Sequence, residues 1–136
     1  MKKTLIDAGP IIAFYDGSDA WHQRVMAFLS SFKGRFVTTM PVVTEAMHRL
    51  GGDFRAQNEL LSDLSRQLFE IENLQISDFR RIAHLNSKYS DLPGDFADLT
   101  LIALAERLDI DEIFSLDSDF DVYRLLRKKP FKRIGP

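Results

Sequence analysis

The segment from Phe96 to Asp109, FADLTLIALAERLD, is apolar almost all round the helix that its pattern predicts. Such a helix has to be covered on most sides, as happens when it packs on a sheet between other elements. Along the rest of the chain, helical patterns alternate with apolar runs typical of strands, at 3–8, 35–39, 111–117 and 131–134. This alternation favours right-handed crossovers. The sequence therefore predicts an α/β fold, a three-layer α/β/α sandwich with a mainly parallel central sheet.

Turn and capping residues divide the segments between these strands. Gly9-Pro10 is typical of a turn that ends the first strand. We expect Ser77 to cap a helix that runs to about Tyr89. The other expected elements are a helix capped by Ser18 or Asp19 and closed by Gly34, a helix from Pro41 to Leu50, a more polar helix at 53–68, a weaker strand at 68–76, a loop at 91–95 and a short helix at 119–126.

The 136 residues fit one domain, spanning 1–136, that is large enough to bury a core. No apolar run approaches the roughly 20 residues that cross a bilayer. The lysines and apolar residues at the start resemble a signal peptide, but Asp7, Gly9 and Pro10 interrupt the run, so a first strand is the preferred interpretation. Because the chain has no cysteine, neither disulfides nor thiolate chemistry is available, and we expect a cytoplasmic setting.

The formal net charge of −2 conceals an uneven distribution of charge. Six of the 18 basic residues lie close together near the end, with no acid among them: Arg124, Arg127, Lys128, Lys129, Lys132 and Arg133. We call these six residues the basic tail. A segment of this kind is either a solvated end or a strip that contacts nucleic acid.

Carboxylates stand where the expected strands end and where the following helices begin. Ligands of a parallel α/β sheet bind outside the carboxyl ends of its strands. We therefore expect one edge of the sheet to gather four acids from separate segments: Asp7, Glu45, Asp98 and Asp117. Asp95 and Asp119 are close enough in sequence to join them.

Several carboxylates at one edge repel each other, and a cation would offset that repulsion. Oxygen ligands without cysteine suit Mg²⁺ or Mn²⁺. Zinc is disfavoured, because His22, His48 and His84 show no paired ligand spacing.

Each acid also has a purely structural interpretation. Asp95 and Asp98 fit a capping pattern, and for this pair capping is the better explanation. Asp117 could form an Asx turn that begins the next helix, and Glu45 could complement a helix dipole. Asp7 is the hardest to explain in this way, because an acid that ends an apolar first strand gains little from capping.

The chain resembles PIN-domain proteins, the metal-dependent nucleases that include the VapC-type toxins. Three segments carry the resemblance, and they stand in the family's order: LIDAGPIIAFYDGSDAWHQRVMAFL, VVTEAMHRL and DLPGDFADLTLIALAERLDIDEIFSLDSDFDVYR. The resemblance implies that Asp7, Glu45, Asp98 and Asp117 form an acidic catalytic pocket. It adds Asp119 as a further metal ligand beside Asp7, Asp98 and Asp117, and it gives Ser115 and Asp95 supporting roles.

The implied activity is Mg²⁺- or Mn²⁺-dependent endoribonuclease cleavage of RNA phosphodiester bonds, leaving a 5′-phosphate and a 3′-hydroxyl. Single-stranded or tRNA-like RNA is the implied substrate, with the basic tail contacting its phosphates. The family also implies a small antitoxin as partner, if the chain is a type II toxin, and a homodimer formed through the helices between residues 53 and 90.

Three other interpretations compete with the nuclease. A receiver domain needs an early acidic pair and a lysine that closes a late strand, and neither is found. A haloacid-dehalogenase-type phosphatase needs a second acid two residues after Asp7, where this chain has Gly9. A catalytically silent PIN-fold module that binds RNA or protein stays open.

Overall fold

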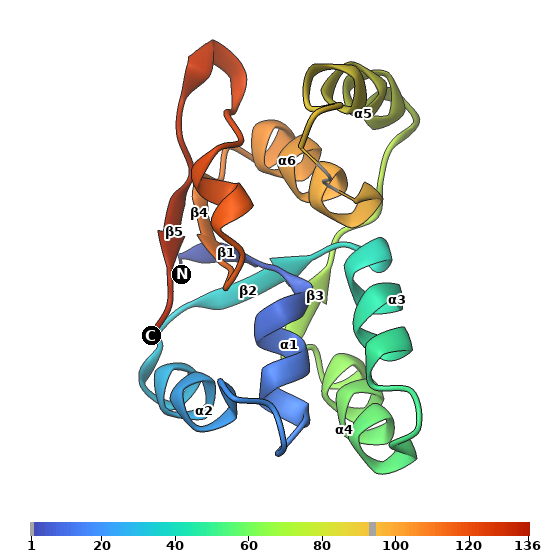
Figure 1. The fold of residues 1–136 in the computed structure, drawn as a ribbon, viewed down its shortest axis with the longest axis vertical. Coiled ribbons are helices and arrows are strands. Elements are labelled where there is room, and N and C mark those ends of the chain that lie inside the picture. The colour runs from blue at the N-terminus through green and yellow to red at the C-terminus, as the bar shows by residue number, and fades with distance from the viewer. Residues whose placement is uncertain (1, 93–94) are drawn as a thin grey trace.

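The computed structural model describes residues 2–92 and 95–136 and contains one five-stranded sheet (Figure 1). Its strands lie in the order β3-β2-β1-β4-β5, and every pairing is parallel. Their bounds are β1 Lys3–Ile6, β2 Arg35–Thr38, β3 Phe69–Ile71, β4 Glu112–Phe114 and β5 Lys132–Ile134. Since β1 and β4 are neighbours, the chain crosses the sheet between them, which places residues more than 100 positions apart side by side.

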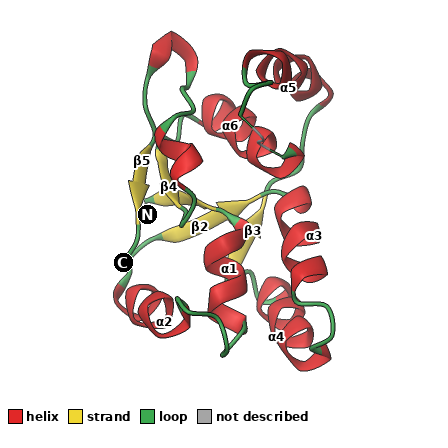
Figure 2. Cartoon of the chain, in the orientation of Figure 1, coloured by secondary structure: helices red, strands yellow, loops and turns green. Residues whose placement is uncertain are grey.

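Helices cover both faces of this sheet, as Figure 2 shows. Figure 1 places α1 and α2 on one side and α5 and α6 on the other, while α3 contacts both α1 and α6. The α/β/α sandwich with a parallel sheet is thereby confirmed. The helices are α1 Ala8–Tyr15, α2 His22–Ser31, α3 Met40–Arg49, α4 Phe54–Ser65, α5 Ile76–Lys88 and α6 Phe96–Leu108, followed by the 3₁₀ turns Ser118–Asp121 and Leu126–Lys128.

Helix α1 corrects the expectation that Gly9-Pro10 forms a turn. The helix begins at Ala8, so both residues lie in its first turn. Backbone N–H groups there have no partner within the helix, and proline therefore removes no hydrogen bond. Asp7 is the N-cap, with a side chain that accepts a hydrogen bond from the Ala8 N–H. Asp7 therefore caps a helix, contrary to the expectation that it gains little from capping.

Three further boundaries differ from expectation. Neither Ser18 nor Asp19 caps α2, since Trp21 is the N-cap, although Asp19 Oδ1 accepts a hydrogen bond from the Trp21 N–H. Ser77 does not cap α5, since Gln75 is the N-cap and shares a capping box with Asp78. The short helix expected at 119–126 is a 3₁₀ turn that ends at Asp121, after which Arg124 forms an antiparallel bridge with Pro130. The loop predicted at 91–95 includes two residues outside the described ranges.

The core lies on both sides of the sheet, and α6 contributes more buried residues to it than any other described helix. Nine consecutive residues of α6, from Ala97 to Ala105, are buried, as its apolar sequence predicts. No helix within 2–92 and 95–136 has both the length and the apolar composition to cross a membrane.

Hydrogen bonds fix the edge of the sheet where the carboxyl ends of the strands meet. The Asp7 N–H donates to the Phe114 carbonyl across the β1–β4 pairing. The buried Thr38 hydroxyl donates to the Ile6 carbonyl, so the ends of β1 and β2 are tied as well. The backbone positions from which Asp7 and Ser115 project are therefore set by the sheet itself.

The burial of α6 predicts a large cost for shortening its inner side chains. Leu101→Ala removes a side chain with no exposed surface, so the free energy of unfolding should fall by about 2–5 kcal/mol. Leu61→Ala on α4, where the side chain is 46% exposed, is the matched control and should change it by less than about 1 kcal/mol. Urea denaturation followed by circular dichroism measures both, and equal effects would contradict this account of the core.

Candidate active site

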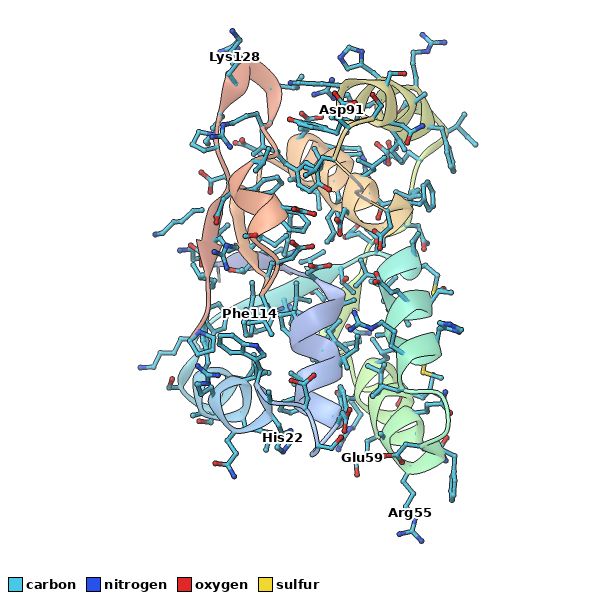
Figure 3. All side chains as sticks on the ribbon, viewed as in Figure 1. His22, Arg55, Glu59, Asp91, Phe114 and Lys128 are labelled. Carbon is cyan, nitrogen blue, oxygen red and sulfur yellow. The ribbon has the colours of Figure 1, made fainter. Side chains whose placement is uncertain are left out.

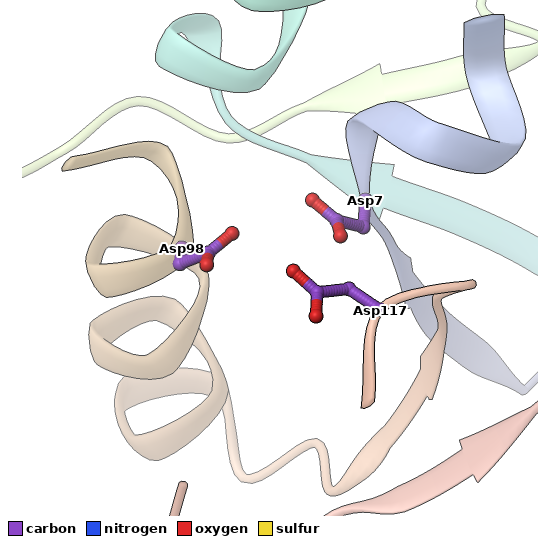
Figure 4. A group of neighbouring side chains, drawn as sticks. All are labelled: Asp7, Asp98 and Asp117. Atoms are coloured by element: carbon purple, nitrogen blue, oxygen red, sulfur yellow. The ribbon is translucent and has the colours of Figure 1, made fainter. Parts of the chain in front are cut away.

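Three aspartates from separate segments face one another at this edge of the sheet (Figure 4). Asp7 follows β1, Asp98 lies in the first turn of α6, and Asp117 follows β4. One carboxylate oxygen from each residue lies within 4.8 Å of the other two. Asp7 and Asp98 are only 5% and 6% exposed, whereas Asp117 is open to solvent. We call these residues the aspartate triad.

Ser115 links two members of the triad. Its Oγ donates a hydrogen bond of 3.0 Å to Asp7 Oδ2 and accepts one of 3.0 Å from the Asp117 N–H. The serine is almost completely buried, so its bond to Asp7 is shielded from water. The hydroxyl thus fixes the Asp7 carboxylate and the backbone of the loop that carries Asp117.

Asp98 is held by a residue that sequence analysis did not identify. The hydroxyl of the fully buried Tyr123 donates a hydrogen bond of 3.1 Å to Asp98 Oδ2. Asp95 caps α6, since its Oδ1 accepts from the Asp98 N–H at 2.9 Å. The structural interpretation of Asp95 is thus confirmed. That of Asp98 is not, because its carboxylate points into the triad rather than to the helix end.

Asp119 and Glu45 occupy different positions relative to the triad. The Asp119 N–H donates to Asp117 Oδ1 at 2.9 Å, and its own carboxylate lies outside the group of three. Glu45, on α3, is also outside the triad. It lines the same pocket of about 420 Å³ as Asp7, Asp95, Asp98 and Asp117.

Burial and mutual repulsion raise the pKa values of the pocket carboxyls. Burial is the main cause for Asp98, whose pKa rises to about 8, with Asp7 and Asp95 adding to it and the Tyr123 hydroxyl opposing it. Burial raises the pKa of Asp7 to about 6, against the Ala8 N–H and Ser115 hydrogen bonds. The pKa of Glu45 rises to about 7 through burial, Asp95 and Asp7, while Arg49 lowers it.

These properties fit a hard divalent cation. The triad offers three carboxylate oxygens converging on one point, without the sulfur or imidazole ligands that would favour zinc. Burial is the largest cause of the raised pKa values of Asp7 and Asp98, neighbouring carboxylates add to it, and neither residue forms an ion pair with a described basic side chain. A cation held between the three carboxylates would remove that repulsion.

The basic tail does not form one continuous strip. Lys129 pairs with Asp111, Lys132 with Glu112, and Arg133 with Asp121. The Arg124 guanidinium donates to the carbonyls of residues 121–123. Arg127 and Lys128 make no ion pair among the described residues, and Figure 3 shows Lys128 at one end of the molecule.

The PIN domain family model matches residues 4–125, and the chain belongs to this family. The resemblance seen in the sequence is confirmed. Ribonuclease VapC26 of Mycobacterium tuberculosis is 26% identical to the chain over 117 residues, which cover 83% of the chain and 85% of that protein.

Solved structures share the fold. The crystal structure of VapC20 from Mycobacterium tuberculosis, a toxin that cleaves the sarcin-ricin loop, superposes with a TM-score of 0.82 at 16% identity and covers 95% of this chain and all of that one. A chain of a toxin-antitoxin complex from Klebsiella pneumoniae superposes with a TM-score of 0.63 at 14% identity, over 85% of this chain and 87% of that one. At these identities the likeness shows the fold alone.

The raised pKa of Asp98 makes the stability of the metal-free protein depend on pH. The folded state favours the protonated carboxyl, whose ordinary pKa is 3.8, so stability is lost as the pH rises from about 4 through about 8. With EDTA present at pH 8, Asp98→Asn should therefore be more stable than wild type, on the order of 1–3 kcal/mol. The difference should shrink towards pH 4.

Thermal unfolding at a series of pH values measures this effect. Glu59→Gln removes an exposed carboxylate on α4 and is the control. Its difference in stability from wild type should not grow with pH. Adding Mn²⁺ should raise the melting temperature of wild type more than that of Asp98→Asn. A variant less stable than wild type throughout the range would contradict the proposed repulsion.

Proposed function

We propose that this chain is a metal-dependent endoribonuclease that hydrolyses RNA phosphodiester bonds and acts as the toxin of a type II toxin-antitoxin pair. The convergence of Asp7, Asp98 and Asp117 on one point is the observation that carries the proposal. Membership of the PIN domain family and the likeness to ribonuclease VapC26 support the choice of RNA as substrate. We propose that residues 1–136 act as one nuclease domain.

In this proposal the aspartate triad holds Mg²⁺ or Mn²⁺, with Asp119 as a further ligand on the solvent side. The ion would polarise the scissile phosphate and offset the charge that grows in the transition state. Ser115 and Tyr123 keep Asp7 and Asp98 in place, so that the ligands need little rearrangement when the cation binds.

Glu45 is our candidate for the general base. It stands outside the triad but lines the same pocket, so its carboxylate is not needed as a ligand. Its pKa of about 7 lies near neutral pH, where a group can both accept and release a proton. Glu45 would take the proton of the attacking water, and in-line attack would leave a 5′-phosphate and a 3′-hydroxyl.

The partners and the setting follow from the same family. The Klebsiella pneumoniae neighbour belongs to a toxin-antitoxin complex, and we propose by analogy that a small antitoxin binds this chain. A homodimer through α4 and α5 is supported by exposed apolar side chains on them, among which Phe54, Ile76 and Phe79 are prominent. Single-stranded or tRNA-like RNA is the proposed substrate. We propose that the basic tail contacts this RNA beyond the cleaved bond. The proposed location of the activity is the cytoplasm.

The rival function is a silent PIN-fold module that binds RNA or protein without cleaving. This hypothesis requires no bound cation and assigns no function to the aspartate triad. It accounts neither for the burial of Asp7 and Asp98 nor for the hydroxyl groups that hold them. The nuclease accounts for both.

Removal of one triad carboxylate should abolish cleavage and preserve the fold. Asp7→Asn and Asp98→Asn should each lower the Mn²⁺-dependent rate by at least about 100-fold, because a ligand and a negative charge are lost together. Wild type in EDTA should be inactive, and added Mn²⁺ should restore it. Gel analysis of labelled single-stranded RNA measures cleavage, and circular dichroism monitors the fold.

Glu59→Gln serves as the matched control, since it removes one carboxylate from an exposed position on α4 and should leave the rate unchanged. Wild-type protein that binds RNA yet never cleaves it with either metal would favour the silent module. Full activity of Asp7→Asn would exclude the triad as the active site.

A further inference from the structure

The proposed substrate is a polyanion, and the pocket that would receive it is lined with acids. Asp7, Glu45, Asp95, Asp98 and Asp117 all line it. One bound divalent cation would not neutralise all the negative charge that these carboxylates can carry. Four of the six residues of the basic tail already contact protein carboxylates or carbonyls. One of them, Arg133, reaches the Ser115 carbonyl, but its guanidinium is paired with Asp121 and it does not line the pocket.

Among the described residues that line this pocket, Arg49 is the only basic one. It is the last residue of α3, one turn after Glu45. Its side chain is 57% exposed, and its Nη1 lies 4.0 Å from Glu45 Oε1, which is too long for a hydrogen bond. No described residue accepts a hydrogen bond from its guanidinium. The group therefore stands at the pocket wall with its donors available.

From this position we propose that Arg49 binds the non-bridging oxygens of an RNA backbone phosphate within the acidic pocket. The inference rests on the proposed ribonuclease function and names a substrate contact for that site. Arginine suits this role because its planar guanidinium presents paired N–H donors that match two phosphate oxygens. Its loose contact with Glu45 can be exchanged for the phosphate at little cost, since exposed ion pairs contribute little to stability.

Arg49 also explains how the phosphate is placed relative to the other groups. Glu45 lies one helical turn away on α3, and the triad lines the same pocket. A phosphate held by Arg49 is therefore kept close to both the cation ligands and Glu45. Such a contact recognises the backbone and not the base, so removing it should weaken the binding of all RNA sequences alike.

The test measures binding of a short fluorescent single-stranded RNA to proteins that carry Asp98→Asn, so that the strand stays intact. Adding Arg49→Ala should weaken binding by about tenfold. It should also reduce the slope of log affinity against log salt concentration by about 0.7 for each phosphate that is no longer neutralised. Arg49→Lys should keep the slope and recover only part of the affinity, because the charge remains but the paired donors do not.

Arg55→Ala is the matched control, since it removes the same charge from the exposed start of α4, which Figure 3 shows at one end of the molecule. It should leave both the affinity and the slope unchanged. Equal slopes for the Arg49→Ala and Arg55→Ala proteins, or absence of RNA binding by the Asp98→Asn protein, would overturn the proposal. A lower melting temperature of Arg49→Ala with an unchanged slope would indicate a structural role only and would overturn it too.

Failure of the ribonuclease proposal has a different signature. It appears as wild-type protein that does not cleave RNA in Mn²⁺, whatever residue 49 is. An Arg49-dependent salt slope in such a protein would still support the phosphate contact.

Discussion

The burial of carboxylates close together at one edge of the sheet is the constraint on which the rest of the site depends. Asp7 and Asp98 are almost fully buried, and burial is the largest cause of their raised pKa values. Repulsion would favour separation of these carboxylates if the backbone allowed it. Here the backbone cannot separate them, because β1, β4 and the start of α6 are fixed by parallel pairing and by the burial of nine residues of α6.

Hydroxyl groups, rather than basic side chains, hold these acids in place. Ser115 donates to Asp7, and Tyr123 donates to Asp98. A neutral donor orients a carboxylate and leaves its charge in place, whereas a lysine or arginine would neutralise it and compete with a cation. The same choice explains why the pKa of Asp98 stays high although it accepts a hydrogen bond. The protein thus provides ligand positions and leaves most of the charge for a bound ion.

Much of this fold can be predicted from the sequence, because it follows from local residue patterns and from the order of strands and helices. Alternation of strand and helix patterns predicts a parallel sheet, and the sheet in turn predicts that Asp7, Asp98 and Asp117 meet at one edge. The first helix was missed, because Gly9 and Pro10 indicate a turn unless Asp7 is known to cap a helix. Tyr123 was also missed, since no local pattern shows that a tyrosine 25 residues after Asp98 packs beneath it.

The basic tail shows why charges that are close together in a sequence need not form one surface in the folded protein. Its residues lie close together along the chain, yet β5 pairs with β4 in a register that brings Lys132 beside Glu112 at the start of both strands. Parallel strands begin at one edge of the sheet and end at the other, so Lys132 lies at the edge opposite the triad. Arg49 is the opposite case. It is an isolated arginine near Glu45 in the sequence, yet it lines the acidic pocket, because α3 starts where β2 ends. Where a charge lies relative to the ends of the strands decides what it can bind, and a count of charges along the sequence does not contain that information.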